Sequence, residues 1–187
     1  MDSVFSVAND PFMIEDLSLI DDILGSRKDI IGPDYAGYRN HVCRMVRFCL
    51  VQGDLSEEER QKVIIAGCFH DIGIWTAGTF DYLPPSIVEA NEYLERNGLE
   101  EWTPEISLMI DQHHKLHEYQ TDPLTEVFRK GDLVDFSLGI VKCGVSVDYI
   151  RQVKAEFPNA GFHKFLVRLA GRWFCRHPLN PVPVLKW

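Results

Sequence analysis

The stretch that decides the fold is SEEERQKVIIAGCFHDIGIW, residues 56–75. Ser56, followed three residues later by Glu59, forms a capping-box pattern that marks the beginning of a helix. We expect this helix to continue to residue 72 and to carry the adjacent pair His70 and Asp71 near its carboxyl end. Because His70 continues the apolar stripe of the helix, its imidazole is predicted to point into the protein interior.

The helical spacing of apolar residues recurs along most of the chain, and strict two-residue alternation is rare. We therefore predict an all-α protein, a single-domain helical bundle over residues 1–187. Besides 57–72, the predicted helices cover residues 11–24, 34–52, 86–98, 105–119, 124–138, 146–157 and 161–176. Pro11 is expected in the first turn of the first helix and Gly25 at its exit. Residues 73–83 are expected to form a loop, and the proline-rich tail 177–187 is expected to run extended over the surface.

The composition excludes several classes of partner. The chain has 19 Lys and Arg against 28 Asp and Glu, a net charge of −9. Nucleic acids and anionic membranes attract clustered positive charge, so we expect no broad surface for either. No segment resembles a membrane helix or a signal peptide, so a cytoplasmic protein is expected, and unused apolar faces would suit a homodimer. The five cysteines form no CxxC pair and are expected to be reduced core thiols.

Two further polar residues lie on the apolar faces of their predicted helices. His41 shares its face with Met45, and Asp132 is in line with Phe128. A carboxylate buried among apolar neighbours is costly unless a cation or strong donors compensate it. Three helices would thus each aim a ligand inward, and a divalent metal with open coordination positions would satisfy all of them. The simpler alternatives are a hydrogen-bonded core histidine at His41 and a core carboxylate at Asp132 that meets an arginine: Arg39, Arg44 or Arg47.

The ordered set His41, His70-Asp71 and Asp132, with GCFHDIGIW ending one helix and RKGDLVDFS in another, resembles the HD-domain superfamily of metal-dependent phosphohydrolases. The resemblance covers about residues 34–140, and the helices and tail of 146–187 lie outside it. It implies an HD-type helical bundle in which these four residues bind one divalent transition metal per chain, with Mn, Fe, Co, Ni and Mg as candidates. The metal would activate water for attack on a phosphoester.

The resemblance also suggests roles for residues around the metal. Asp71, His113 and Arg129 are the predicted catalytic residues, with Asp71 or a neighbour steering a proton and Arg129, one turn before Asp132, meeting phosphate charge. Lys115 and Arg44 are further candidate substrate contacts, although such cations are more often solvated surface charges. In the segment after the His-Asp pair, Trp75, Phe80 and Tyr82 either wall the site or close the core between two helices.

Histidines of the helix expected at 105–119 offer a second metal or substrate site. In dinuclear HD proteins a histidine of a similar His-His pair binds a second metal, which makes His113 the first candidate here and His114 the second. His117, His163 and His177 are expected to be ordinary surface or core histidines. The chain lacks the further histidine of dinuclear relatives between Asp71 and His113, and it has Ile74 and Trp75 where relatives often place a lysine or an acid.

Three functions remain open from the sequence. The leading hypothesis is a metal-dependent hydrolase of a small phosphorylated metabolite, with a nucleotide as one option and metal-activated water as the nucleophile. The second is an HD-fold diiron oxygenase, which the His113-His114 pair favours. The third is a non-catalytic metal-bearing sensor or assembly module, which the missing charge after the His-Asp pair favours.

Overall fold

The computed structural model describes residues 11–177 and 183–184, and within these ranges it contains helices and no β-strand. The predicted all-α fold is therefore confirmed. The helices are α1 (Ile14–Gly25), α2 (Lys28–Ile31), α3 (Tyr35–Leu50), α4 (Glu57–Phe69), α5 (Gly73–Thr76), α6 (Leu83–Asn97), α7 (Thr103–Gln112), α8 (Pro123–Phe136), α9 (Val147–Glu156) and α10 (Phe162–Arg176). Short 3-10 turns at Gly32–Asp34 and Glu100–Trp102, like α2, are elements that the apolar pattern does not predict.

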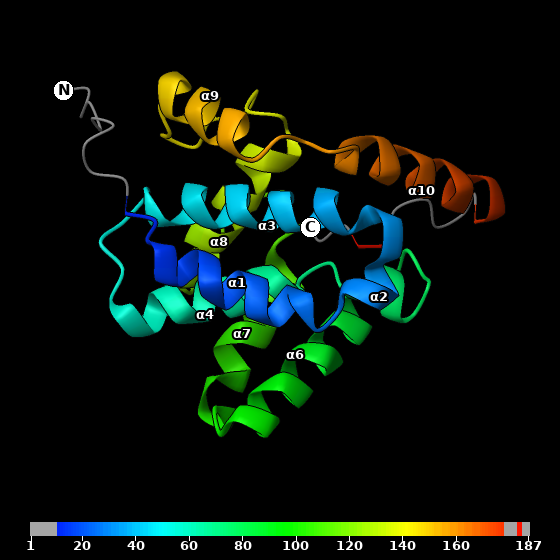
Figure 1. Cartoon of the computed structure of the whole chain (residues 1–187), viewed down its shortest axis with the longest axis horizontal. Coiled ribbons are helices and arrows are strands. Elements are labelled where there is room, and N and C mark those ends of the chain that lie inside the picture. The colour runs from blue at the N-terminus through cyan, green and yellow to red at the C-terminus, as the bar shows by residue number, and fades with distance from the viewer. Residues whose placement is uncertain (1–10, 178–182, 185–187) are drawn as a thin grey trace.

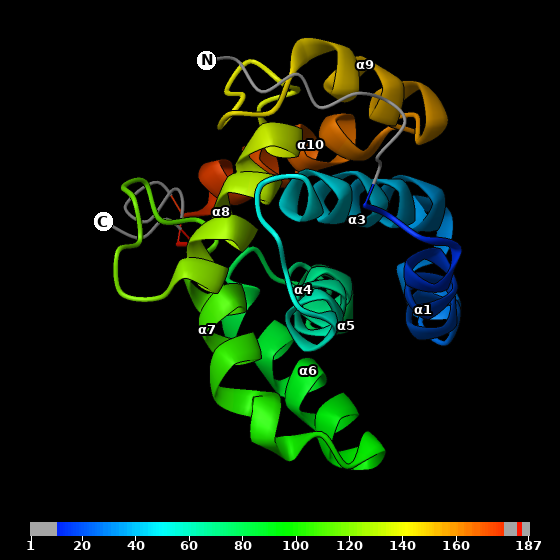
Figure 2. The same cartoon turned by 90° about the vertical axis from the view of Figure 1, so that its left-hand side faces the viewer.

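Helix α3 crosses the middle of the molecule, with α1 and α4 packed along one side of it and α9 and α10 on the other (Figure 1). Helices α6 and α7 form a pair that projects away from this centre. Turned by 90°, the molecule shows α8 leading from α7 towards α9 and α10 (Figure 2). Helix α8 packs closely on α3. Apolar side chains from α1, α3, α4 and α6 to α10 meet in one hydrophobic core.

The beginning of α4 follows the predicted capping box. The Ser56 hydroxyl accepts the Glu59 backbone N–H at 3.2 Å, and the Glu59 carboxylate accepts the Ser56 N–H at 2.8 Å. Helix α1 ends at Gly25 as expected, but it begins at Ile14 rather than at Pro11. The reason is a local cap, because the Asp16 carboxylate accepts the Met13 N–H at 2.7 Å.

The expected loop at 73–83 is wrong for its first four residues, which form the single helical turn α5, and for Leu83, with which α6 begins. The Gly73 N–H donates to the Ser86 hydroxyl at 2.9 Å, and a Cβ at Gly73 would overlap the Tyr82 carbonyl oxygen. This close approach docks α5 against the beginning of α6. The chain that leaves the His70-Asp71 pair is thereby held in place.

The helix expected at 105–119 is wrong beyond Gln112, where α7 ends. The His113 ring donates from Nδ1 to the Ile110 carbonyl oxygen at 2.7 Å, which occupies the acceptor that the next helical N–H would use. The chain then turns, with the Lys115 N–H bonded to the Gln112 carbonyl at 2.9 Å. His113 and His114 therefore lie in a turn, and His117 is exposed.

The remaining expectations concern the tail, the cysteines and the membrane. The extended tail predicted at 177–187 lies mostly outside the described residues. All five cysteines are free, and Cys43, Cys49 and Cys68 are buried as expected, but Cys175 is exposed on α10 and Cys143 is half-buried, so the core prediction is wrong there. Within the described ranges, no helix combines the length and apolar character that crossing a membrane requires.

Candidate metal centre

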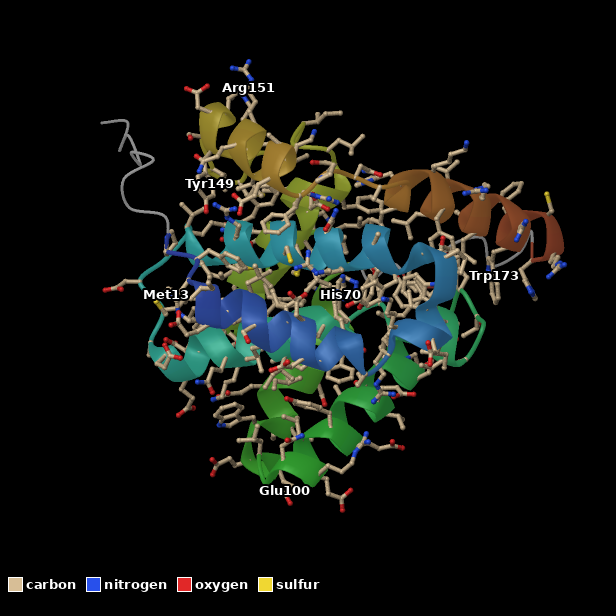
Figure 3. The ribbon with its side chains drawn as sticks, in the orientation of Figure 1. Met13, His70, Glu100, Tyr149, Arg151 and Trp173 are labelled. Carbon is tan, nitrogen blue, oxygen red and sulfur yellow. The ribbon has the colours of Figure 1, made fainter. Side chains whose placement is uncertain are left out.

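Three helices bring the four predicted ligands together in the interior. His41 comes from α3, His70 and Asp71 follow the end of α4, and Asp132 comes from α8. The Nε2 atom of His41 lies 3.1 Å from that of His70 and 3.5 Å from Asp132 Oδ1, and His70 Nε2 lies 3.3 Å from Asp71 Oδ2. All four residues are at most 4% exposed, and His70 lies in the middle of the molecule (Figure 3).

The two imidazoles turn their lone pairs towards each other. His41 donates from Nδ1 to the Asp135 carboxylate at 2.7 Å, and His70 donates from Nδ1 to the Gly67 carbonyl oxygen at 2.8 Å. In a neutral ring whose Nδ1 carries the proton, Nε2 is an acceptor. Burial lowers the pKa of His70 to about 3, which keeps that ring neutral. Two acceptor nitrogens at 3.1 Å repel unless a cation lies between them.

His113 adds a third imidazole with the same arrangement. Its Nδ1 is used by the Ile110 carbonyl, and its Nε2 lies 3.7 Å from Asp71 Oδ1. Among the described residues, neither Asp71 Oδ1 nor His113 Nε2, both buried, has a hydrogen-bond partner. Buried polar atoms in native proteins are nearly always satisfied, so this pair points to a group that the polypeptide itself does not supply.

The charges of the two carboxylates strengthen this argument. Burial acts to raise the pKa of Asp71, but His70, His113 and His41 outweigh it and hold the pKa below its ordinary value. For Asp132 burial dominates and raises the pKa to about 6, so that its carboxylate is still mostly charged at neutral pH. The pKa of His113 is lowered by burial and raised more strongly by Asp71 and Asp132. The cluster thus places two carboxylates beside the Nε2 atoms of His41 and His70 in the interior, and the same carboxylates favour a positive charge on His113.

Within the part of the chain that the structure describes, three overlapping groups of side chains could each hold a metal ion. In each group the potential ligand atoms lie within 4.8 Å of one another. The groups are His41, His70 and Asp132; His70, Asp71 and His113; and His113, His114 and Asp132. Mixed imidazole and carboxylate ligands suit divalent transition metals, so the residues present fit the expected cofactor.

The third group includes the weaker of the two predicted second-site histidines. His114 is half-buried, and its Nε2 is hydrogen-bonded to the Tyr82 hydroxyl at 2.5 Å. Its ring lies beside that of His113, with centroids 3.9 Å apart. The pair is therefore close enough to join the centre, while the number of metals that bind there stays a prediction.

Asp135 is a residue of the centre that the sequence analysis missed. One oxygen accepts His41 Nδ1–H, and the carboxylate also accepts Arg44 Nε and Nη2 at 2.5 and 2.8 Å. A carboxylate that accepts the other ring N–H of a metal-binding histidine fixes the tautomer and the orientation of that histidine. A usable signal was present, because Asp135 lies one helical turn after Asp132 and seven residues after the buried Phe128.

Three of the four predicted ligands, His41, Asp71 and Asp132, line a cavity of about 460 Å³, and we call this part of the cavity its floor. Its wall includes the predicted residues His113, His114, Lys115, Arg129 and Tyr82 together with apolar residues of α8 and α10. Arg129 is held by the Glu126 carboxylate through two hydrogen bonds, from Nε and Nη2, each 2.7 Å long. The structure therefore places two cationic side chains, Lys115 and Arg129, in the same cavity as the cluster.

Two of the predicted substrate contacts, Arg44 and Trp75, do not line this cavity. Arg44 is absent from the cavity wall because its guanidinium binds Asp135 and the carbonyl oxygens of Phe157 and Pro158. Trp75 is also absent from it, since its ring stacks on Phe165 at 5.4 Å and its position closes the core.

The structure also decides among the alternatives for Asp132 and for the remaining histidines. The three arginines considered as partners of Asp132 bind other carboxylates: Arg39 binds Asp21, Arg44 binds Asp135 and Arg47 binds Glu156. His163 lines the cavity, with its Nε2 within 3.1 and 3.2 Å of the carbonyl oxygens of Asp135 and Phe136. His177 stacks on Trp173.

Comparison with known proteins gives no relative from which a role could be transferred. No protein-family model matches the chain, and neither a curated protein nor a solved structure matches it at a significant level.

Proposed function

We propose that this chain is a metal-dependent phosphohydrolase of the HD type that acts on a small phosphomonoester. The observation that carries the proposal is a buried cluster of possible ligands, His41, His70, Asp71 and Asp132. Three of them, all but His70, line a cavity that also holds Lys115 and Arg129. The order of these four residues along the helices is that of the HD superfamily. A cytoplasmic location, a single metal per chain and a homodimer stay part of the same hypothesis.

The metal ion would make the main contribution to catalysis at such a site. A divalent metal on these ligands lowers the pKa of bound water and neutralises charge on a phosphoryl oxygen. His41 and His70 are already in the tautomer that a metal ligand needs, because each donates from Nδ1 to a fixed acceptor. Binding of the metal would therefore require little rearrangement of these two side chains.

The remaining cavity residues have distinct tasks in the proposed reaction. Arg129 and Lys115 bind the phosphoryl oxygens, and the two bonds from Glu126 hold the Arg129 guanidinium in place beforehand. His113 Nε2 faces Asp71 and is placed to hold a proton during the reaction. The water oxygen bonds to phosphorus, the bond to the ester oxygen breaks, and the alcohol leaves with a proton while phosphate is released.

The test is a metal-reconstitution experiment with a matched pair of histidine variants. The chain is stripped with a chelator, reloaded separately with Mn, Fe, Co, Ni or Mg, and assayed for phosphate release from phosphomonoesters, phosphodiesters and nucleotides. His70→Ala should lose both metal content and hydrolysis, whereas His117→Ala, at an exposed position, should keep both. Hydrolysis that persists in metal-free His70→Ala would refute the proposal.

One observation favours a second candidate, an HD-fold diiron oxygenase. The group of His113, His114 and Asp132 could hold a second ion beside the first. Elemental analysis separates the two functions, because two irons per chain with oxygen-dependent turnover would favour the oxygenase. Failure of every metal and every substrate class in the screen would favour the third interpretation, a non-catalytic sensor or assembly module.

A further inference from the structure

The cavity above the candidate metal centre combines charged and imidazole groups with a large apolar lining from α8 and α10. Its apolar lining includes Phe136 from α8, Leu138 just beyond that helix, and Phe162, Leu166, Val167 and Ala170 from α10. The charged and imidazole groups are contributed mainly by the floor and by the turn after α7. A ligand in this cavity would therefore meet polar partners at one end and hydrocarbon along the rest.

The polar groups near the apolar walls are already engaged. His163 Nε2 is bonded to the carbonyl oxygens of Asp135 and Phe136, and the Tyr82 hydroxyl is bonded to His114. A ribose hydroxyl or a base edge placed there would lose its bonds to water and gain few in return, which is costly. The walls suit a hydrocarbon group better than a nucleoside.

The length of the wall can be read from α10. Its first residue, Phe162, stacks on His41 with ring centroids 4.2 Å apart, so this end of the helix lies at the metal centre. Ala170 lies two helical turns further along and still lines the cavity. Eight residues at about 1.5 Å each give a wall of roughly 12 Å, the length of an extended chain that joins a phosphorus atom through its ester oxygen to about eight carbon atoms.

Exposed apolar side chains continue the wall to its rim. Phe136 is 51% exposed and Val167 is 73% exposed, although both line the cavity. Covering such side chains with a hydrocarbon ligand removes apolar surface from water on both partners, which favours binding. The rim of the cavity therefore favours a hydrocarbon group, as the walls do.

We propose that the phosphomonoester taken by this site has an apolar alcohol part, an aliphatic chain or ring group of about six to eight carbon atoms, and that nucleotides are not its substrates. The phosphate lies at the floor near Lys115 and Arg129, and the hydrocarbon lies between α8 and α10. This inference names the substrate class of the proposed phosphohydrolase and rests on that function.

The first test measures binding without turnover. Metal-loaded chain is titrated by calorimetry with alkylphosphonates from ethyl to octyl, at concentrations where each is monomeric, and with adenosine and uridine monophosphates. Each added methylene should lower Kd about fourfold until the wall is covered, and both nucleotides should bind more weakly than hexylphosphonate. A Kd independent of chain length, tighter binding of a nucleotide, or no binding of any phosphonate would overturn the inference.

Two phenylalanines provide a matched pair of variants. Phe136 lines the cavity and Phe174 on α10 does not, while their exposed fractions, 51% and 57%, are similar. Phe136→Gln should weaken octylphosphonate about tenfold and leave ethylphosphonate unchanged, whereas Phe174→Gln should leave both unchanged. Equal effects of the two variants on octylphosphonate would contradict the placement of the hydrocarbon.

A parallel assay of the corresponding alkyl phosphates separates this inference from the proposed function. Chain-length-dependent binding without hydrolysis of any ester under any metal would refute the phosphohydrolase and support the apolar wall. Hydrolysis with no preference for longer alkyl groups, or with a preference for nucleotides, would support the phosphohydrolase and refute the apolar substrate.

Discussion

Replacing Asp135 by Asn tests how the metal centre is positioned. Its carboxylate accepts three hydrogen bonds, one from His41 and two from Arg44, and both side chains of the Arg44–Asp135 ion pair are only 2% exposed. In Asn, one of the two oxygens becomes an NH₂ donor. Either His41 or Arg44 must then lose its acceptor, and the buried guanidinium loses its counter-charge.

The expected cost follows from burial. Removing one partner of a buried ion pair lowers the free energy of unfolding by about 3–5 kcal/mol, because the other partner is left as an uncompensated charge. Arg44 keeps the carbonyl oxygens of Phe157 and Pro158, at 3.0 and 3.3 Å, so we expect the low end of that range. With about 2–4 °C of Tm for each kcal/mol in a chain of this size, Tm should fall by roughly 6–12 °C. Metal affinity should fall by about 10–100-fold, because His41 loses the group that orients it.

The chain offers a matched control in the Arg39–Asp21 pair. This is also a two-bond arginine–aspartate pair made by α3, at 2.5 and 2.9 Å, but its side chains are 23% and 43% exposed. Exposed ion pairs contribute about 0–1 kcal/mol, so Asp21→Asn should shift Tm by less than about 4 °C and leave metal affinity unchanged.

Thermal denaturation and metal titration by calorimetry measure the two effects separately. A double variant, Arg44→Met with Asp135→Leu, should regain most of the lost stability, because replacing a buried ion pair with apolar side chains is often neutral. Its metal affinity should stay low, since His41 still lacks an acceptor. The reasoning is refuted if Asp135→Asn costs no more than Asp21→Asn, or if it binds metal as tightly as the wild type.

Three further outcomes can be measured on the same protein. Metal at 100 times its Kd should stabilise the fold by about 2.7 kcal/mol, seen as a higher Tm that a chelator reverses. Gly131→Ala should lower the free energy of unfolding by about 1–3 kcal/mol, because its Cβ would overlap Cys49 Sγ and lie 2.8 Å from the Met45 carbonyl oxygen. Gly171→Ala, which has open space around it, should instead raise the free energy of unfolding by about 0.5–1 kcal/mol. Burial raises the pKa of the Cys43 thiol to about 12, so at pH 8 iodoacetamide should label exposed Cys175 and spare Cys43 until the protein unfolds, as mass spectrometry would show.

Local signals in the sequence predict the helices well where their cause is local. The Ser56–Glu59 capping box places the beginning of α4, and the apolar spacing that follows predicts its inward face. The end of α7 is different, because it depends on an imidazole that bonds back to the Ile110 carbonyl. Apolar spacing continues past that point, and nothing in the periodicity indicates which side chain interrupts the helix.

The ligand order was accessible from the sequence, whereas the partners of the ligands were not. Arg44 and Asp135 lie 91 residues apart in the chain, and a positive charge does not reveal which carboxylate it will meet. The sequence therefore suggests a phosphate contact for Arg44, whereas in the structure its guanidinium binds the Asp135 carboxylate, which also accepts His41 Nδ1–H. Trp75 was open to two interpretations for the same reason, because its contact with Phe165 joins distant parts of the chain.

The short segment GDLVD of α8 explains how one helix can control both ends of one imidazole. Asp132 Oδ1 lies 3.5 Å from His41 Nε2, and Asp135 Oδ2 lies 2.7 Å from His41 Nδ1. Residues three apart on a helix differ by about 60° in direction. The Asp132 carboxylate therefore faces Nε2 of the His41 ring, and the Asp135 carboxylate faces Nδ1. Gly131 makes this possible, because only a residue without a Cβ lets α8 approach α3 so closely at Met45 and Cys49, one to two helical turns beyond His41. The tautomer of His41 and its distance from the candidate ligands are therefore set by the same helix contact, and a change that moves α8 away from α3 should weaken both together.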